Sequence, residues 1–331
     1  MKNDDIISFQ NNPNRRSFIK GIGGAVAGVT LLNTANQSMG KSHVSGHKKS
    51  ATSLPLSTNS YPWFTFYQRQ NRNWENELPK VISEIKISGS DCLEPNLKSV
   101  EFTDTLSAEL EKQGIGMISV YVGSELHEKE KAKTSIDGIL AIVKRATKLM
   151  GTQIVVTNPN PINWGTEENK TDEQLEVQRD ALNDLGQAIS SEGMTLAYHF
   201  HAPEFRAGAR EFHHMMASTN PEYVKMCLDS HWVFRGAGDS NVALHDVVKL
   251  YGDRVVELHL RQSRGGIWTE TFEDGDIDHP RLARELEAIG VRPLVTMEQC
   301  VEAQSPNTMD SLAAHKISHA EVRKVFASFI S

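Results

Sequence analysis

Residues 152–201 read TQIVVTNPNPINWGTEENKTDEQLEVQRDALNDLGQAISSEGMTLAYHFH, two short apolar runs on either side of a long amphipathic segment. The runs at 152–158 and 195–201 are rich in β-branched and aromatic residues, which is typical of buried strands. Between them, residues 171–193 place apolar side chains at helical spacing, and Thr171 stands where a helix N-cap is expected. The stretch therefore predicts a strand, a helix and a second strand.

The same alternation continues along the rest of the chain. A Gly-rich phosphate-binding turn after the first strand would indicate a doubly wound open sheet, and none is present. We therefore predict an α/β protein with a (β/α)8 TIM barrel over residues 61–331. The expected strands are 62–68, 90–95, 115–122, 152–158, 195–201, 224–232, 255–262 and 293–299, and the expected helices are 74–85, 102–114, 135–151, 171–193, 241–253, 279–290 and 317–331.

The composition excludes several classes of protein. The chain has 331 residues and a formal net charge of -7, which argues against nucleic acid as a partner because phosphate binding needs a clustered basic surface. The body of the chain has no apolar run long enough to cross a membrane. The three cysteines are widely spaced, and we expect free, buried thiols rather than a disulfide framework.

The N-terminal region has the pattern of an export signal. Arg15 and Arg16 are adjacent, a short weakly apolar segment follows at 21–32, and small residues come next. This order predicts a twin-arginine signal peptide over residues 1–40. We expect the twin-arginine export machinery as a partner, a periplasmic or exported location, and a linker over residues 41–60.

Polar side chains gather where the predicted strands end, which in this fold is the face that carries active sites. Buried charges are costly unless they are paired or coordinate a cation. A mixture of imidazole and carboxylate groups suits Mn²⁺, Zn²⁺, Fe²⁺ or Co²⁺. The side chains concerned are Glu94, Asn158, Asn160, His199, His201, Glu204, Asp229, His231, His259, Arg261, Glu298 and Gln299.

Five short motifs resemble one family. They are YHFHAPEF at 198–205, CLDSHW at 227–232, ELHLRQS at 257–263, EDGDIDHP at 273–280 and TMEQC at 296–300. In order and spacing they are similar to the xylose-isomerase-like TIM barrels, also called the sugar phosphate isomerase/epimerase family. The resemblance covers the chain from about residue 61 onward.

The resemblance implies a divalent metal held by the last four strands, and Mn²⁺ is the ion that we expect. Three residues match the family's ligands directly, and His199 stands where the family has a glutamate. His201 and Glu204 are alternatives to His199 as the ligand of the fifth strand. The implied metal ligands are His199, Asp229, His259 and Glu298; the implied proton-transferring pair is His201 and Glu298; and the implied substrate-binding residues are Glu94, Glu204, His231 and Arg261.

The resulting hypothesis is an exported, metal-dependent sugar isomerase or epimerase that works through an enediolate. A 3-keto-glycoside lyase or hydrolase, acting by β-elimination at the same site, is the alternative. A non-catalytic sugar-binding barrel is the alternative of another class. The expected ligand is a sugar or glycoside, and the sequence leaves a homo-oligomer open.

Overall fold

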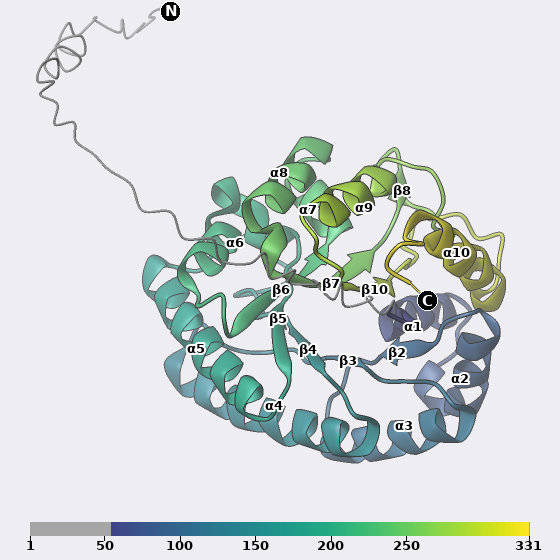
Figure 1. The fold of residues 1–331 in the computed structure, drawn as a ribbon, viewed down its shortest axis with the longest axis horizontal. Helices are drawn as coiled ribbons and strands as arrows, with labels where there is room; N and C mark the ends of the chain where they lie inside the picture. Colours follow the sequence, from purple (N-terminus) through teal and green to yellow (C-terminus); the bar gives the residue numbers. More distant parts are fainter. Residues whose placement is uncertain (1–53, 331) are drawn as a thin grey trace, which may run out of the picture. The chain divides into compact units, whose positions relative to one another are not determined.

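The computed structural model describes residues 54–330, so the predicted signal peptide lies outside the described residues. Eight parallel strands form one sheet in the order β2-β1-β10-β7-β6-β5-β4-β3. Isolated bridges from Cys92 to Gly116 and from Asn96 to Tyr121 join its two edges. The sheet thus closes into the predicted barrel, with helices arranged around the strands (Figure 1).

Strands and helices alternate along the described chain as the sequence predicts, with two further α-helices, short 3-10 helices and a small antiparallel hairpin added between them. One of these added helices, residues 230–236, begins within the strand predicted at 224–232, which ends at Asp229. The strands are β1 Leu56–Asn59, β2 Cys92–Glu94, β3 Ser119–Tyr121, β4 Ile154–Thr157, β5 Thr195–Tyr198, β6 Val224–Asp229, β7 Val255–Leu260, β8 Ser263–Arg264, β9 Ile267–Trp268 and β10 Leu294–Met297. The helices are α1 Ser60–Arg69, η1 Trp74–Glu77, α2 Leu78–Ile87, α3 Val100–Gln113, α4 Lys129–Met150, α5 Asp172–Ser191, η2 Ala202–Phe205, α6 Arg206–Ser218, α7 Ser230–Gly236, α8 Asn241–Tyr251, η3 Gly252–Arg254, α9 His279–Ala288 and α10 Ser311–Val325.

The first strand was predicted wrongly. The aromatic run at 62–68 lies in α1 and not in a strand, because the Asn59 side chain caps that helix by accepting from the Tyr61 N–H, and Pro62 fits its first turn. The strand is β1, within the segment expected to be a linker. Its sequence LSTN is mostly polar yet fully buried, so hydropathy does not reveal it.

Three helix starts also differ from the prediction. Helix α3 begins after Ser99, whose hydroxyl accepts from the Phe102 N–H, and α4 begins at Lys129, six residues before the predicted serine. Helix α10 begins six residues before the predicted start, because the Asp310 side chain caps it. Other local predictions are confirmed. Thr171 caps α5 through a capping box with Gln174, and α3 ends at Gly114 in the left-handed conformation that favours glycine.

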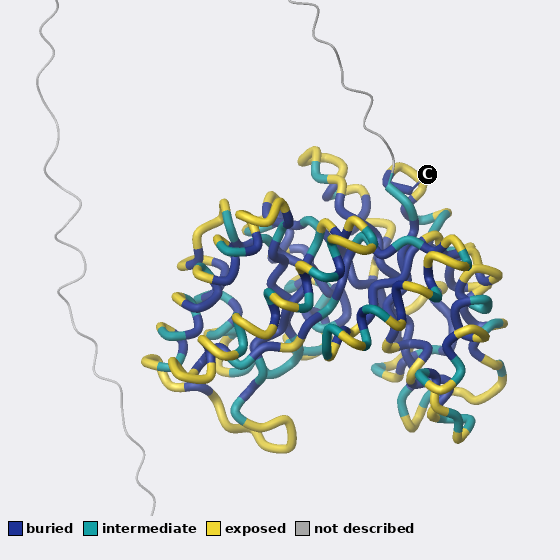
Figure 2. The backbone as a smooth tube through the Cα atoms, turned by 90° about the horizontal axis from the view of Figure 1, so that it is seen from below, coloured by how far each residue is buried: buried dark blue, intermediate teal, exposed yellow. Residues whose placement is uncertain are grey.

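The core lies between the strands and the inner faces of the helices, while the outer helix faces and loops are exposed (Figure 2). The interior of the barrel itself is partly polar, since Ser119, Glu257 and Thr296 are buried there and bonded to one another. All three cysteines are free and buried, as expected. Within residues 54–330, no helix combines the length and hydropathy needed to cross a membrane.

Candidate functional site

Four of the predicted side chains meet at the carboxyl ends of the strands. Asp229 ends β6, His259 lies near the end of β7, and His199 and Glu298 directly follow β5 and β10. Each offers one ligand atom, and these atoms all lie within 4.8 Å of one another. None of the four is more than 7% exposed. We call His199, Asp229, His259 and Glu298 the four-residue cluster.

Most of the polar atoms that face the centre of this cluster have no hydrogen-bond partner. They include Nε2 of His199, Nδ1 of His259 and Oδ2 of Asp229. Oε2 of Glu298 also faces the cluster and is ion-paired with Arg261. The other oxygen of Asp229 is satisfied, because Oδ1 accepts from the backbone N–H groups of His231 and Trp232 at 2.9 and 2.8 Å. Unsatisfied buried polar atoms cost roughly 1–3 kcal/mol each. A group that binds all of them at once would therefore stabilise the site.

The electrostatics of the cluster suit a cation. Burial, together with His259, holds the pKa of the His199 ring well below its ordinary value, so that ring is neutral near pH 7 and keeps a lone pair. Burial and the neighbouring Glu298 raise the pKa of Asp229 to about 7. Burial lowers the pKa of His259, but Cys227, Glu94 and Glu298 outweigh burial and raise that pKa well above its ordinary value. The metal-free cluster therefore keeps a proton on this ring, which a divalent ion would replace.

Arg261 lies beside the cluster and controls the charge of Glu298. Its Nη2 is 2.9 Å from Glu298 Oε2, and its Nε donates to the Glu298 backbone carbonyl at 3.0 Å. Burial opposes ionisation, but Arg261 and His259 outweigh burial and hold the pKa of Glu298 well below its ordinary value. The guanidinium lies 4.1 Å from the centre of the Trp268 ring, and its Nη1 has no partner.

His201 is held in one orientation by the end of β4. Asn158 Nδ2 donates to Glu204 Oε1 at 2.8 Å, so its Oδ1 is the atom that faces His201 Nδ1 at 2.9 Å. A carbonyl oxygen can only accept, which places the ring proton on Nδ1 and leaves the lone pair on Nε2. Burial and His199 lower the pKa of His201 to about 3, so the ring is neutral.

Three predicted substrate-binding residues contact protein groups. Glu94 is fully buried and lies against His259 and Asn59. Both carboxylate oxygens of Glu204 are engaged, by Asn158 and by the His201 N–H. His231 Nε2 accepts from the Trp268 indole N–H at 2.8 Å.

Sequence reasoning gave no role to several polar groups that support the cluster. Glu257 lies two residues before His259 on the same face of β7, and strand alternation was the signal that would have found it. Asn59 belongs to the strand that was predicted wrongly. Tyr121 ends β3 and lies with its ring centre 5.5 Å from that of His199.

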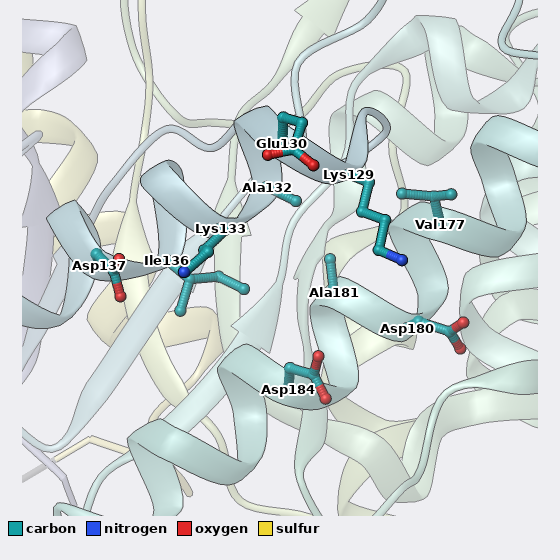
Figure 3. Close-up of a pocket in the computed structure, with 10 residues that line it drawn as sticks. All are labelled: Lys129, Glu130, Ala132, Lys133, Ile136, Asp137, Val177, Asp180, Ala181 and Asp184. Atoms are coloured by element: carbon teal, nitrogen blue, oxygen red, sulfur yellow. The ribbon is translucent and has the colours of Figure 1, made fainter.

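A groove elsewhere on the molecule is not part of this site. It has a volume of about 520 Å³ and lies between α4 and α5 on the outside of the barrel. Charged side chains such as Lys129, Lys133 and Asp180 line it (Figure 3). None of its lining residues follows a barrel strand.

Comparison with known proteins agrees with the geometry. Residues 83–317 match the model of the xylose isomerase-like TIM barrel family. The chain is 26% identical over 202 residues to inosose dehydratase 2 of Bacillus cereus, a match that covers 57% of this chain and 65% of that relative. The chain thus matches just under two thirds of the length of that curated relative.

The solved structures that share the fold include the following two. The 3-keto-D-glucoside 4-epimerase from E. coli has a TM-score of 0.58 at 17% identity, over 82% of this chain and 99% of that chain. The IolI protein, whose structure has a bound zinc atom, has a TM-score of 0.59 at 16% identity, over 84% of this chain and 100% of that chain. With the family match over most of the described barrel, the chain belongs to the xylose isomerase-like TIM barrel family.

Proposed function

We propose that this protein is a metal-dependent sugar isomerase or epimerase that exchanges a proton next to the carbonyl of a sugar or keto-sugar. The observation that carries the proposal is the convergence of unpartnered nitrogen and oxygen atoms in the four-residue cluster. The donor set of two imidazoles and two carboxylates suits a transition metal such as Mn²⁺ or Zn²⁺. The zinc atom bound in the IolI structure supports a transition metal at this site.

The metal would be held by His199, Asp229, His259 and Glu298. When bound there, it would supply Lewis-acid stabilisation of the negative charge that develops on the substrate oxygen. Arg261 Nη1 has no partner in the structure and would donate to a second substrate oxygen.

His201 is the side chain that we propose takes up the proton. Its Nε2 keeps the lone pair because Asn158 holds Nδ1, and an accepted proton would sit beside the negative charge of the enediolate, which favours the imidazolium. Glu298 is the second proton-transferring group, held ionised by Arg261. Return of the proton to the other face of the same carbon gives epimerisation, and return to the neighbouring carbon gives isomerisation.

Elimination is the second candidate. The curated relative is named as an inosose dehydratase, and loss of a group from the carbon next to the enediolate needs the same first proton transfer. A 3-keto-glycoside lyase would use the same groups to expel an aglycone.

We also propose that residues 1–40 direct the chain through the twin-arginine route to the periplasm, since the paired arginines precede a short apolar segment.

Incubation with free ketoses and 3-keto-glycosides in heavy water tests these proposals. Deuterium at the carbon beside the carbonyl is expected, and loss of aglycone or water would identify elimination. Replacing His201 by Gln should slow deuterium uptake by about 10²–10⁴-fold, while His214→Gln on the outer helix α6 should leave it unchanged. Incorporation at the normal rate in His201→Gln would remove the proton-transfer role.

A further inference from the structure

We infer that Glu94 is a positioning residue, which fixes the tautomer of His259 so that Nδ1 of this ring points its lone pair into the four-residue cluster. The inference rests on the proposed function, because it concerns the same metal centre. It also gives Glu94 a role other than the substrate contact expected from the sequence.

The two ring nitrogens of His259 face different groups. Nε2 lies 2.9 Å from Glu94 Oε2 and 3.9 Å from Glu257 Oε1, inside the barrel. Nδ1 lies 3.5 Å from Glu298 Oε2, at the cluster. A carboxylate beside Nε2 favours a proton on that nitrogen, so the proton that a metal displaces is the one on Nδ1, and the Nδ1 lone pair then faces the cluster.

Glu94 is itself held in place by β1 and β3. Asn59 Nδ2 donates to Glu94 Oε2 at 2.6 Å, while Asn59 Oδ1 accepts from the Tyr61 N–H, which settles the orientation of the amide. Ser119 Oγ lies 3.5 Å from the other Glu94 oxygen. Glu94 has no exposed surface with which to contact a substrate.

Glu257 is a poorer partner for the ring, although it is equally buried. Its two oxygens accept from the hydroxyls of Ser119 and Thr296 at 2.6 Å each, and its closest oxygen is 1 Å further from Nε2 than that of Glu94. The chain therefore supplies its own control, a second buried glutamate in the same barrel interior. Loss of a carboxylate that orients a metal-binding histidine typically weakens metal affinity about 10–100-fold.

The experiment measures the affinity of the full-length, chelator-treated protein for Mn²⁺ by competition with a fluorescent chelator, with no sugar present. We expect Glu94→Leu to bind about 10–100-fold more weakly than the unmodified protein. Glu94→Gln should lie between the two, because the amide oxygen can lie beside Nε2 but carries no charge. Glu257→Gln should stay within about threefold of the unmodified protein.

Each outcome decides the inference. Unchanged affinity in both Glu94 variants would overturn it and leave the proposed metal centre standing. An equal loss in Glu257→Gln would also overturn it, since the effect would then be one of general packing. If the unmodified protein binds no Mn²⁺, the metal centre and the inference both fail.

If the Glu94 variants do not fold, a variant of the residue that holds Glu94 tests the inference instead. Asn59→Ser keeps an N-cap for α1 but loses the donor that holds Glu94. We expect its Mn²⁺ affinity to fall at least threefold, and an unchanged affinity would contradict the role of Glu94.

Discussion

Asp229→Asn separates the two roles that the structure gives to this carboxylate. Oδ1 caps α7 through the N–H groups of His231 and Trp232, and asparagine caps helices as well as aspartate does. Oδ2 lies in the four-residue cluster, 3.5 Å from His199 Nε2, without a hydrogen bond. We predict that the metal-free variant is more stable than the unmodified protein at neutral pH and does not respond to Mn²⁺.

The size of the effect follows from the pKa of Asp229. Burial and Glu298 raise this pKa to about 7 in the folded, metal-free protein, while an unfolded aspartate titrates near about 3.9. Between these values the unfolded chain releases a proton that the folded chain keeps, so the free energy of unfolding falls as the pH rises. At about 1.4 kcal/mol per pH unit over roughly three units, the loss is at most about 4 kcal/mol. Asparagine does not titrate, so the variant does not lose this free energy of unfolding as the pH rises.

Urea unfolding of chelator-treated protein at pH 4.5 and pH 7.5 measures this difference. The two proteins should have similar stability at the lower pH, and the variant should be more stable at the higher one. Mn²⁺ at about 100 times its Kd should add about 2.7 kcal/mol to the unmodified protein only. Asp229→Ala, the control, should also lose the cap, which is worth about 1 kcal/mol. A variant that is less stable than the unmodified protein at pH 7.5, or gains as much from Mn²⁺, would refute the reasoning.

Three further predictions test how the barrel is held together. Thr171→Ala removes the capping box of α5 and should cost about 1 kcal/mol in urea unfolding without changing Mn²⁺ affinity; a changed affinity would be contrary evidence. Lys170→Met breaks a buried ion pair with Glu211, at 2.7 Å, and should cost about 3–5 kcal/mol; a loss under 1 kcal/mol would contradict the burial. Gly186→Ala should destabilise the protein, because the new Cβ in α5 would lie 2.7 Å from the Tyr223 carbonyl oxygen. Gly138→Ala in α4 places its Cβ within 4 Å of no atom and should stabilise the protein by about 0.5–1 kcal/mol. A change in unfolding free energy of the same sign at both sites would count against this packing.

The sequence predicts seven of the barrel strands because their apolar runs are distinct from the amphipathic helices between them. It misses β1 because three of its four residues are polar although all are buried. Asn59 donates to Glu94 in the barrel interior, and Thr58, on the other face of the strand, accepts from the Trp63 indole of α1. The aromatic run that follows has the residue types of a strand, but the Asn59 cap starts a helix there. Local propensity gives way to capping and tertiary packing at this point.

The four-residue cluster was predictable because parallel strands in a barrel end on one face, so residues far apart in sequence converge there. The contacts that surround the cluster could not be predicted from the sequence. That Asn158 orients His201, and that Glu94 lies under His259 rather than beside a substrate, depends on side-chain distances between neighbouring strands. No spacing along the chain encodes those distances.

The most direct test of the account is a crystal structure of the full chain grown with Mn²⁺, with the ion located by its anomalous scattering. The account predicts one ion per chain, within about 2.0–2.4 Å of a side-chain atom from each of His199, Asp229, His259 and Glu298. An empty cluster, or an ion bound elsewhere by other residues, would contradict it.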